Sequence, residues 1–247
     1  MADTSSAIVE VAAGMAQRAG TQPPCADGAH VHRRGDRVVA AVVDGAGHRE
    51  ETVDFARRAP SVITLMGMAM GGLVGLITAG RMADAYDRPP HMTAVCASME
   101  PGLPTSIHWI GDARAYGWDG QGLTLYSQDQ TMGEWLRWNG GRTIEILPKE
   151  VAESQDNWAL LGLAQATEMT CRQLQIPEEV PLVLLVSDGI SDQVDQESAE
   201  ALCRTHFDAP QALAEALVAA AEGEVEEDTG VLYRDDATVV VLRRPTA

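Results

Sequence analysis

Residues 38–47 read VVAAVVDGAG, in which six small and β-branched apolar residues are followed by Asp44 and Gly45. Residues 181–189 repeat this arrangement as PLVLLVSDG, with Ser187 between the apolar run and Asp188. Short runs rich in valine and leucine, followed by Asp-Gly, predict strands that end in acidic turns. These two segments are therefore expected to be strands of the sheet core, each with a carboxylate at its end.

Other segments extend this pattern over most of the chain. We expect a first strand at residues 8–13 and a last strand at residues 237–242. Between residues 91 and 126, short alternating runs separated by Gly-Asp and Asp-Gly turns predict a β-meander. Residues 131–175 are expected to be irregular and mostly helical, with Gly140, Gly141 and Pro148 as breakers, and residues 196–203 and 210–221 are expected to be helices.

Residues 62–80 contain no charged side chain and are bracketed by arginines at positions 57, 58 and 81. By length alone, this segment is a candidate for a membrane-spanning helix, and its glycines recur every four residues as in packed membrane helices. The alternative is a buried helix that lies on a sheet, where small residues allow close approach. The two alternatives differ in whether the residues before and after the segment can meet in one site.

Composition and charge limit the possible function. The 247 residues are 45% hydrophobic and 22% charged, which predicts one globular domain over residues 1–247. The net charge of −18 argues against a nucleic-acid or anionic-membrane binder and favours cationic partners or metal ions. The four cysteines form no C-x-x-C pair, so we expect reduced thiols and a cytoplasmic protein. No basic residue precedes Arg18, so no signal peptide is expected.

Carboxylates recur at the ends of the predicted strands. Asp44, Asp112 and Asp188 each follow a strand, and Asp235 precedes one. Strand ends lie at the rims of a sheet, so these side chains can converge on one cleft. Carboxylates that converge without a partner repel one another, and a hard divalent cation relieves that repulsion. Ligands that are all oxygen favour Mg²⁺ or Mn²⁺ over zinc.

Five motifs carry a resemblance to a known family. In order along the chain they are VDGAGH at 43–48, IGDARAY at 110–116, Leu123-Thr124 followed by Asp129, VSDGISD at 186–192 and DDATVVV at 235–241. Their order and spacing resemble those of the bacterial metal-dependent protein Ser/Thr phosphatases of the PP2C (PPM) family. The resemblance covers residues 8–242, which is nearly the whole chain.

The resemblance implies an α+β fold with four layers, α-β-β-α, in which two antiparallel sheets are flanked by helices. Residues 62–80 are then one long helix packed on a sheet, because Asp44 and Asp188 must reach one site from either side of it. A bilayer between these two ligands would separate them, so no membrane span is expected. The protein is expected to be a monomer that binds neither nucleic acid nor membranes.

The resemblance also implies the site. Asp44 would bridge two Mn²⁺ or Mg²⁺ ions and Gly45 would offer its carbonyl to one of them. Asp188 and Asp235 would hold the other ion, and Asp112 with Asp188 would hold a possible third. Water activated by these ions would attack the phosphorus of phosphoserine or phosphothreonine in a protein substrate, without a covalent phosphoenzyme.

The sequence departs from the family at its N-terminal motif. The family carries an arginine that binds phosphate, followed by Asn-Glu-Asp, whereas here Arg18 is followed by a longer gap, and Ala26 stands where Glu is expected. Asp27 is interpreted as the retained metal-binding aspartate and Arg18 as the phosphate-binding residue. Arg33 and Arg34 are alternatives, and a solvated surface arginine is a further one.

Two other positions differ. His48 replaces a glycine at the end of its motif and is a candidate general acid, although a metal-bound water or a merely exposed histidine would explain it as well. Asp236 stands where the family usually has Asn. The other histidines, His91 included, are interpreted as ordinary strand or loop residues.

Residues 130–177 correspond to the segment called the flap in the family. Its tryptophans, Trp135, Trp138 and Trp158, are expected to pack the flap rather than to bind ligand. Residues 222–228 hold five acids and are expected to form a solvated loop. A second functional class stays open because of Ala26 and the stretched N-terminal motif: a PP2C-like pseudophosphatase that acts as a phosphoprotein-binding or regulatory module.

Overall fold

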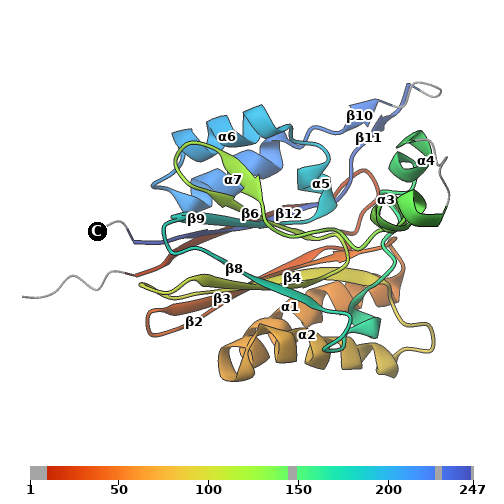
Figure 1. Ribbon diagram of the computed structural model, residues 1–247, viewed down its shortest axis with the longest axis horizontal. Helices are drawn as coiled ribbons and strands as arrows, with labels where there is room; N and C mark the ends of the chain where they lie inside the picture. Colours follow the sequence, from red (N-terminus) through yellow and green to blue (C-terminus); the bar gives the residue numbers. More distant parts are fainter. Residues whose placement is uncertain (1–9, 144–148, 226–229, 246–247) are drawn as a thin grey trace, which may run out of the picture.

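Two five-stranded antiparallel sheets stack face to face in the protein (Figure 1). The structure is a computed structural model and describes residues 10–143, 149–225 and 230–245. The first sheet has the order β1-β12-β9-β6-β7 and the second has the order β2-β3-β4-β5-β8. The strands are β1 (Ala12–Arg18), β2 (Gly28–Arg34), β3 (Arg37–Gly45), β4 (Met92–Met99), β5 (Thr105–Ile110), β6 (Arg114–Trp118), β7 (Leu123–Leu125), β8 (Arg172–Ile176), β9 (Leu182–Val186) and β12 (Ala237–Arg243).

Helices cover the outer face of each sheet. In Figure 1, α1 (Glu50–Met70) and α2 (Gly72–Arg81) lie below the second sheet, and α6 (Gln196–Thr205) and α7 (Pro210–Ala220) lie above the first. This arrangement confirms the expected α+β fold with four layers. The remaining elements are the helices α3 (Met132–Thr143), α4 (Lys149–Glu153) and α5 (Asp188–Ser191), the 3₁₀ turns η1 (Met82–Ala85) and η2 (Leu163–Gln165), and the short strands β10 (Glu224–Val225) and β11 (Leu232–Tyr233).

The layers explain the continuous apolar run of β3. Val38, Ala40 and Val42 point into the core between the two sheets. Their neighbours Val39 and Ala41 point the other way, into the core beneath α1 and α2. Successive side chains of a strand alternate between its faces, so a strand buried on both faces needs apolar residues at every position. Burial of one valine or leucine side chain contributes about 1.5–3 kcal/mol.

The uncharged segment 62–80 forms parts of two helices instead of the single helix expected. Gly71, with φ of 98°, separates α1 from α2. The two helices pack closely at Gly75, where a Cβ atom would lie 2.4 Å from the carbonyl oxygen of Ile63. Among the described residues, no helix combines the length and the apolar character that crossing a membrane requires. The small residues of this segment serve close packing of α2 on α1.

The expected β-meander is divided between the two sheets. β4 and β5 pair in the second sheet, whereas β6 and β7 pair in the first. The chain changes sheets at Gly111, whose φ of 89° allows the sharp turn after β5. Four of the described strands were not predicted: the short pair β10 and β11, and β2 and β8, which are edge strands of the second sheet with few fully buried residues. β1 begins at Ala12, later than expected, because its register is set by pairing with β12.

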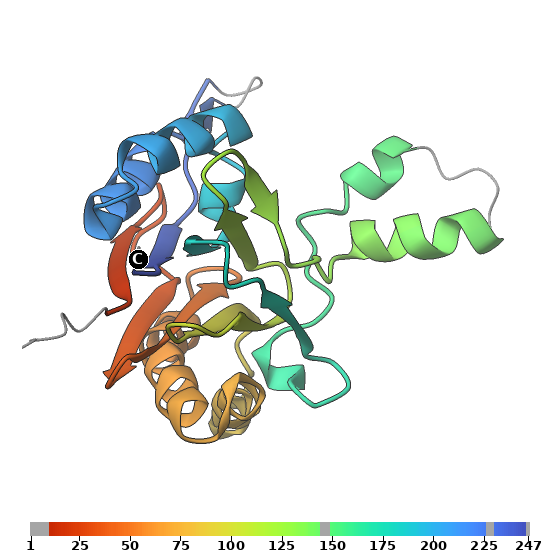
Figure 2. The ribbon, with the colours of Figure 1, turned by 60° about the vertical axis from the view of Figure 1, so that its left-hand side comes forward.

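The flap segment leaves the sandwich at one end, where α3 and α4 project from the body (Figure 2). The expectation that its tryptophans pack the flap is wrong, because Trp135, Trp138 and Trp158 are 53%, 67% and 58% exposed. Trp135 and Trp138 lie on the projecting α3, which offers no second apolar layer against which their rings could be buried, whereas Trp158 follows α4 and lines the cavity described below. Gly140 and Gly141 lie within α3 and do not end it, and Pro148 lies outside the described residues. Of the acidic segment 222–228, residues 224–225 form β10, which pairs with β11, and residues 226–229 lie outside the described residues.

Candidate metal centre

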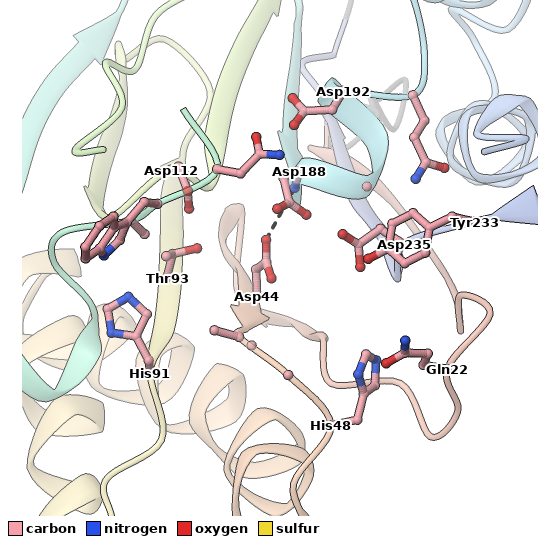
Figure 3. Close-up of a pocket in the computed structure, with 18 residues that line it drawn as sticks. Gln22, Asp44, His48, His91, Thr93, Asp112, Asp188, Asp192, Tyr233 and Asp235 are labelled. Carbon is pink, nitrogen blue, oxygen red and sulfur yellow. Dashed lines mark hydrogen bonds between the residues drawn. The ribbon is translucent and has the colours of Figure 1, made fainter. Parts of the chain in front are cut away.

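A cavity of about 770 Å³ opens at one end of the sandwich, and four of the predicted carboxylates line it (Figure 3). Asp44 stands near the end of β3, and Asp112 lies in the turn that follows β5. Asp188 is the first residue of α5, just after β9, and Asp235 lies shortly before β12. Neighbouring antiparallel strands place these particular ends at the same rim, so residues almost 200 positions apart in the sequence share one cavity.

The four carboxylates destabilise one another's charged forms. Burial raises the pKa of Asp44 well above its ordinary value, and repulsion from Asp27 and Asp112 adds to this increase. Burial also raises the pKa of Asp188, with further repulsion from Asp44 and Asp235. Burial is the first cause of the raised pKa of Asp112 and of Asp235 as well. Taken together, these groups form a negative site that requires a counter-charge.

The described part of the chain does not supply that counter-charge to the cavity, since neither arginine nor lysine is among its lining residues. Arg114, on β6, lies beside the cavity: its guanidinium binds Asp129 at 2.8 Å and the lining residue Asp192 at 3.0 Å, and it shares an adjoining hollow with Asp112 and Asp188. Its single charge is thus divided among several carboxylates and does not balance them. Hard divalent cations prefer oxygen ligands, and the set of carboxylates offers only those. The residues present therefore fit one or more Mg²⁺ or Mn²⁺ ions.

The carboxylates do not form a tight preformed cage. Within the described ranges, no group of three or more acidic, histidine or cysteine side chains is close enough to be a ready metal cluster. Instead, the side chains stand around a wide cavity. Mg²⁺ commonly keeps several water ligands and takes few from the protein, so a set of separated carboxylates suits it. Asp44, Asp188, Asp235 and Asp112 are the residues that would hold such ions, with the carbonyl of Gly45 beside them.

Arg18 does not reach this cavity. It is the last residue of β1, and its guanidinium donates hydrogen bonds to the carbonyl of Val218, at 2.7 Å, and to that of Ala221. Both carbonyls belong to the C-terminal end of α7, where backbone acceptors lack partners within the helix. The side chain is therefore oriented toward a helix end and away from the carboxylates.

The alternative arginines are also remote from the cavity. Arg33 and Arg34 end β2, at the opposite end of the strand from Gly28, and Arg33 binds the carbonyl of Val11 and the carboxylate of Glu10. Asp27 lies near the site but behind it. It is buried, it repels Asp44 and Asp188, and it faces a separate hollow of about 440 Å³ that Cys25 also lines. Burial is the first cause of its raised pKa.

His48 lines the cavity and is bound to Asp236. Its Nε2 atom lies 3.2 Å from Oδ2 of Asp236, which is 3% exposed. Asp236 does not itself line the cavity, although it directly follows Asp235. The histidine thus stands at the wall of the cavity with its ring held by a buried carboxylate.

The sequence did not identify several of the residues that line the cavity. His91, interpreted there as an ordinary residue, lines the cavity, and its Nε2 atom is buried without a hydrogen-bond partner. His91 immediately precedes β4, and Met92 of β4 pairs with Gly45. Strand pairing alone therefore brings His91 to the end of the sheet where Asp44 lies. Further lining residues that were not singled out include Gln22, Thr93, Gln193 and Tyr233. Asp192, the last residue of the motif at 186–192, lines the cavity as well. A search for partners of the Asp-Gly strand ends would have found His91 and Thr93.

Solved structures share this fold. The chain superposes on the serine/threonine phosphatase PstP/Ppp of Mycobacterium tuberculosis with a TM-score of 0.70 and 19% identity, covering 96% of this chain and 99% of that one. The PPM Ser-Thr phosphatase MsPP of Mycobacterium smegmatis gives 0.70 and 20% over 96% and 100%. The S. agalactiae serine/threonine phosphatase gives 0.71 and 15% over 95% and 99%. No family profile matches the sequence, and neither does any curated protein.

These likenesses confirm, at the level of the fold, the resemblance predicted from the five motifs. The superposition extends over nearly the whole length of both chains, so no large part of those phosphatase folds is missing here. Because one fold can carry different activities, the chemistry must be argued from the cavity itself.

Proposed function

We propose that the protein hydrolyses phosphoserine and phosphothreonine in proteins, with Mn²⁺ or Mg²⁺ bound at the cavity. The observation that carries this proposal is the convergence of Asp44, Asp112, Asp188 and Asp235 on one cavity whose described lining contains neither arginine nor lysine. The fold shared with PPM phosphatases supports the choice of phosphoester hydrolysis over other reactions that metal ions assist.

In the proposed reaction, Asp44, Asp112, Asp188 and Asp235 would hold two or three cations in the cavity. When bound, such ions activate water as a nucleophile and neutralise the charge of the phosphoryl oxygens. The walls orient the substrate: His48 and Gln22 come from one side, and His91 and Thr93 from the other (Figure 3). A histidine within reach of the leaving oxygen can return a proton to the serine or threonine alkoxide, and His48 and His91 are the two candidates.

The finer features of the proposal rest on the sequence and on the fold family. We propose phosphorylated proteins as partners because the cavity is open to the surface beside the projecting flap, where a protein segment can approach. A monomer and a cytoplasmic location belong to the same proposal, the latter because the cysteines form no disulfide or zinc motif.

The test is hydrolysis of p-nitrophenyl phosphate and of a phosphothreonine peptide in Mn²⁺, for the wild type, Asp188→Asn and Asp208→Asn. Asp208 is an acid with a side chain 86% exposed, remote from the cavity, and is the matched control. We expect Asp188→Asn to lower kcat/KM more than about 100-fold, since loss of an outer-shell partner of a metal already costs 10–100-fold. Equal rates in all three proteins, or no hydrolysis by the wild type, contradict the proposal.

The second candidate function is a phosphoprotein-binding module without turnover. Ala26, in place of an expected acid, and the distance of Arg18 from the cavity favour it. Calorimetric titration with Mn²⁺ separates the two functions. Binding of at least two ions together with turnover supports the enzyme, whereas binding of a phosphopeptide without turnover at any Mn²⁺ concentration supports the module.

A further inference from the structure

The N-terminal segment 19–27, which is longer than the family motif, is hydrogen-bonded to residues 234 and 236, next to the cavity residue Asp235. The backbone N–H of Thr21 donates to the carbonyl of Arg234 at 2.9 Å. At its two ends, the N–H groups of Gly20 and Ala26 donate to the two carboxylate oxygens of Asp236, at 2.7 and 2.6 Å. The extra residues are therefore a loop closed by one buried carboxylate.

The two oxygens of Asp236 are both used. Oδ1 accepts from Gly20, and Oδ2 accepts from Ala26 and faces Nε2 of His48 at 3.2 Å. An asparagine at this position has a single acceptor oxygen, and its amide nitrogen would face an N–H donor on one side. A buried donor left without an acceptor is costly. The carboxylate at position 236, where the family usually has asparagine, is thus matched to this longer loop.

The attachment determines where Gln22 lies. Gln22 is between the two anchored ends of the loop and lines the cavity. Figure 3 shows it on the side of the cavity that also carries His48, Tyr233 and Asp235. The approach is close: a Cβ atom at position 20 would lie 2.3 Å from the carbonyl oxygen of Arg234, so only glycine fits there.

The geometry points to Gln22 as a substrate-binding residue that donates its side-chain N–H to a phosphate oxygen, and to Asp236 as the residue that positions it. This inference rests on the proposed function. The cavity has no arginine among its described lining residues, and Arg114, which lies beside it, is held by Asp129 and Asp192, so the phosphate needs a donor that is not already engaged. An amide N–H that meets a charged phosphate oxygen makes a hydrogen bond stronger than one between neutral groups. In this inference, Gln22 on the longer loop takes the phosphate-binding role of the family's arginine, and the altered motif does not mean that phosphate binding is lost.

The experiment compares Gln22→Ala and Asp236→Asn with the wild type, as full-length proteins in Mn²⁺. Gln121→Ala is the matched control, because Gln121 is an exposed glutamine in the turn between β6 and β7, outside the cavity. Measured quantities are KM and kcat for p-nitrophenyl phosphate, the inhibition constant of inorganic phosphate and the calorimetric affinity for Mn²⁺. We expect both test variants to raise KM and the inhibition constant about 10-fold, with Mn²⁺ affinity nearly unchanged. In Gln22→Ala kcat should stay nearly unchanged, whereas in Asp236→Asn kcat should also fall, because His48 loses its carboxylate partner.

Two results would overturn the inference. One is an unchanged KM and phosphate inhibition constant in Gln22→Ala, an exposed position whose substitution leaves the fold intact. The other is a loss of Mn²⁺ affinity in Asp236→Asn without a change in phosphate affinity, which would make Asp236 a support of the metal site alone. If the wild type has no turnover, the proposed function fails. Calorimetric binding of inorganic phosphate to the Mn²⁺-loaded wild type and Gln22→Ala then still decides the role of Gln22.

Discussion

The guanidinium of Arg18 binds the carbonyls of Val218 and Ala221 at the end of α7, so its role is expected in stability. Arg18→Met keeps the apolar stem and removes the donors. We expect a loss of about 1–2 kcal/mol in the free energy of unfolding, since hydrogen bonds to charged groups contribute about 1.5–3 kcal/mol and this side chain is partly exposed. Turnover of p-nitrophenyl phosphate should not change.

Thermal unfolding and steady-state kinetics of Arg18→Met check this expectation, with Arg34→Met at the exposed end of β2 as control. A decrease of several degrees in Tm is expected for Arg18→Met alone. A raised KM with an unaltered Tm would instead return Arg18 to the phosphate-binding role that the sequence predicted.

At the scale of single residues, the sequence predicted those site residues that stand at the end of a regular strand. Asp44 and Asp188 follow apolar strands, and the ends of those strands determine where both carboxylates lie. The position of Gln22 depends on the course of an irregular loop, and the contacts of Arg18 depend on which helix end lies nearby. Neither feature produces a periodic pattern in the sequence. Asp236 was recognised as a departure from the family, but its use as an acceptor for two N–H groups needs the folded loop.

The helix pair α1 and α2 offers a test in which local propensity and packing predict opposite signs. Alanine favours a helix over glycine by about 1 kcal/mol, so propensity predicts that Gly75→Ala stabilises the protein. A Cβ atom there would lie 2.4 Å from the backbone oxygen of Ile63, which α2 can relieve only by moving away from α1. We expect a net loss of about 1–3 kcal/mol, the usual cost of overpacking.

Chemical denaturation of Gly75→Ala and of Leu65→Ala, an exposed position of α1, measures this difference. The control should change stability by no more than about 0.5 kcal/mol. An increase in the stability of Gly75→Ala would mean that α2 does not press on α1 as the structure has it.

Elements with a strict period were predictable, whereas those that depend on their neighbours were not. The last strand, expected at residues 237–242, is β12 at Ala237–Arg243, and α6 and α7 were predicted within two residues. β2 has a polar sequence, with His30, His32 and two arginines, and becomes a strand through its pairing with β3. The tryptophans of the flap look like core residues in the sequence, and only the projection of α3 from the sandwich exposes them.

On the scale of the whole molecule, the acidic cavity links stability to pH and to metal ions. The carboxyl groups of Asp44, Asp188, Asp112 and Asp235 have raised pKa values in the folded protein, with burial as the first cause. Between the ordinary carboxyl pKa of about 4 and these raised values, the folded state binds more protons than the unfolded state. The stability of the metal-free protein therefore falls as pH rises through this window, and the penalty is complete above the raised pKa values.

A divalent cation at the cavity offsets the same repulsion, so we expect Mn²⁺ to raise Tm more at pH 8 than at pH 5.5, where protons compete with it for the carboxylates. Asp188→Asn removes one of the repelling charges. This variant should raise the Tm of the metal-free protein at pH 8 and lose most of the stabilisation by Mn²⁺. Thermal unfolding in EDTA or in Mn²⁺ at both pH values measures these effects.

The net charge of −18 creates a general repulsion that any salt would relieve. Two controls separate this general effect on Tm from the effect of Mn²⁺ bound at the four carboxylates. Sodium chloride at matched ionic strength should reproduce only a small part of the increase in Tm. Asp208→Asn, which removes one exposed charge far from the cavity, should keep the full response to Mn²⁺. An equal response of Asp188→Asn and Asp208→Asn to Mn²⁺ would show that the cation acts on the overall charge of the molecule, and that the four carboxylates are not its binding site.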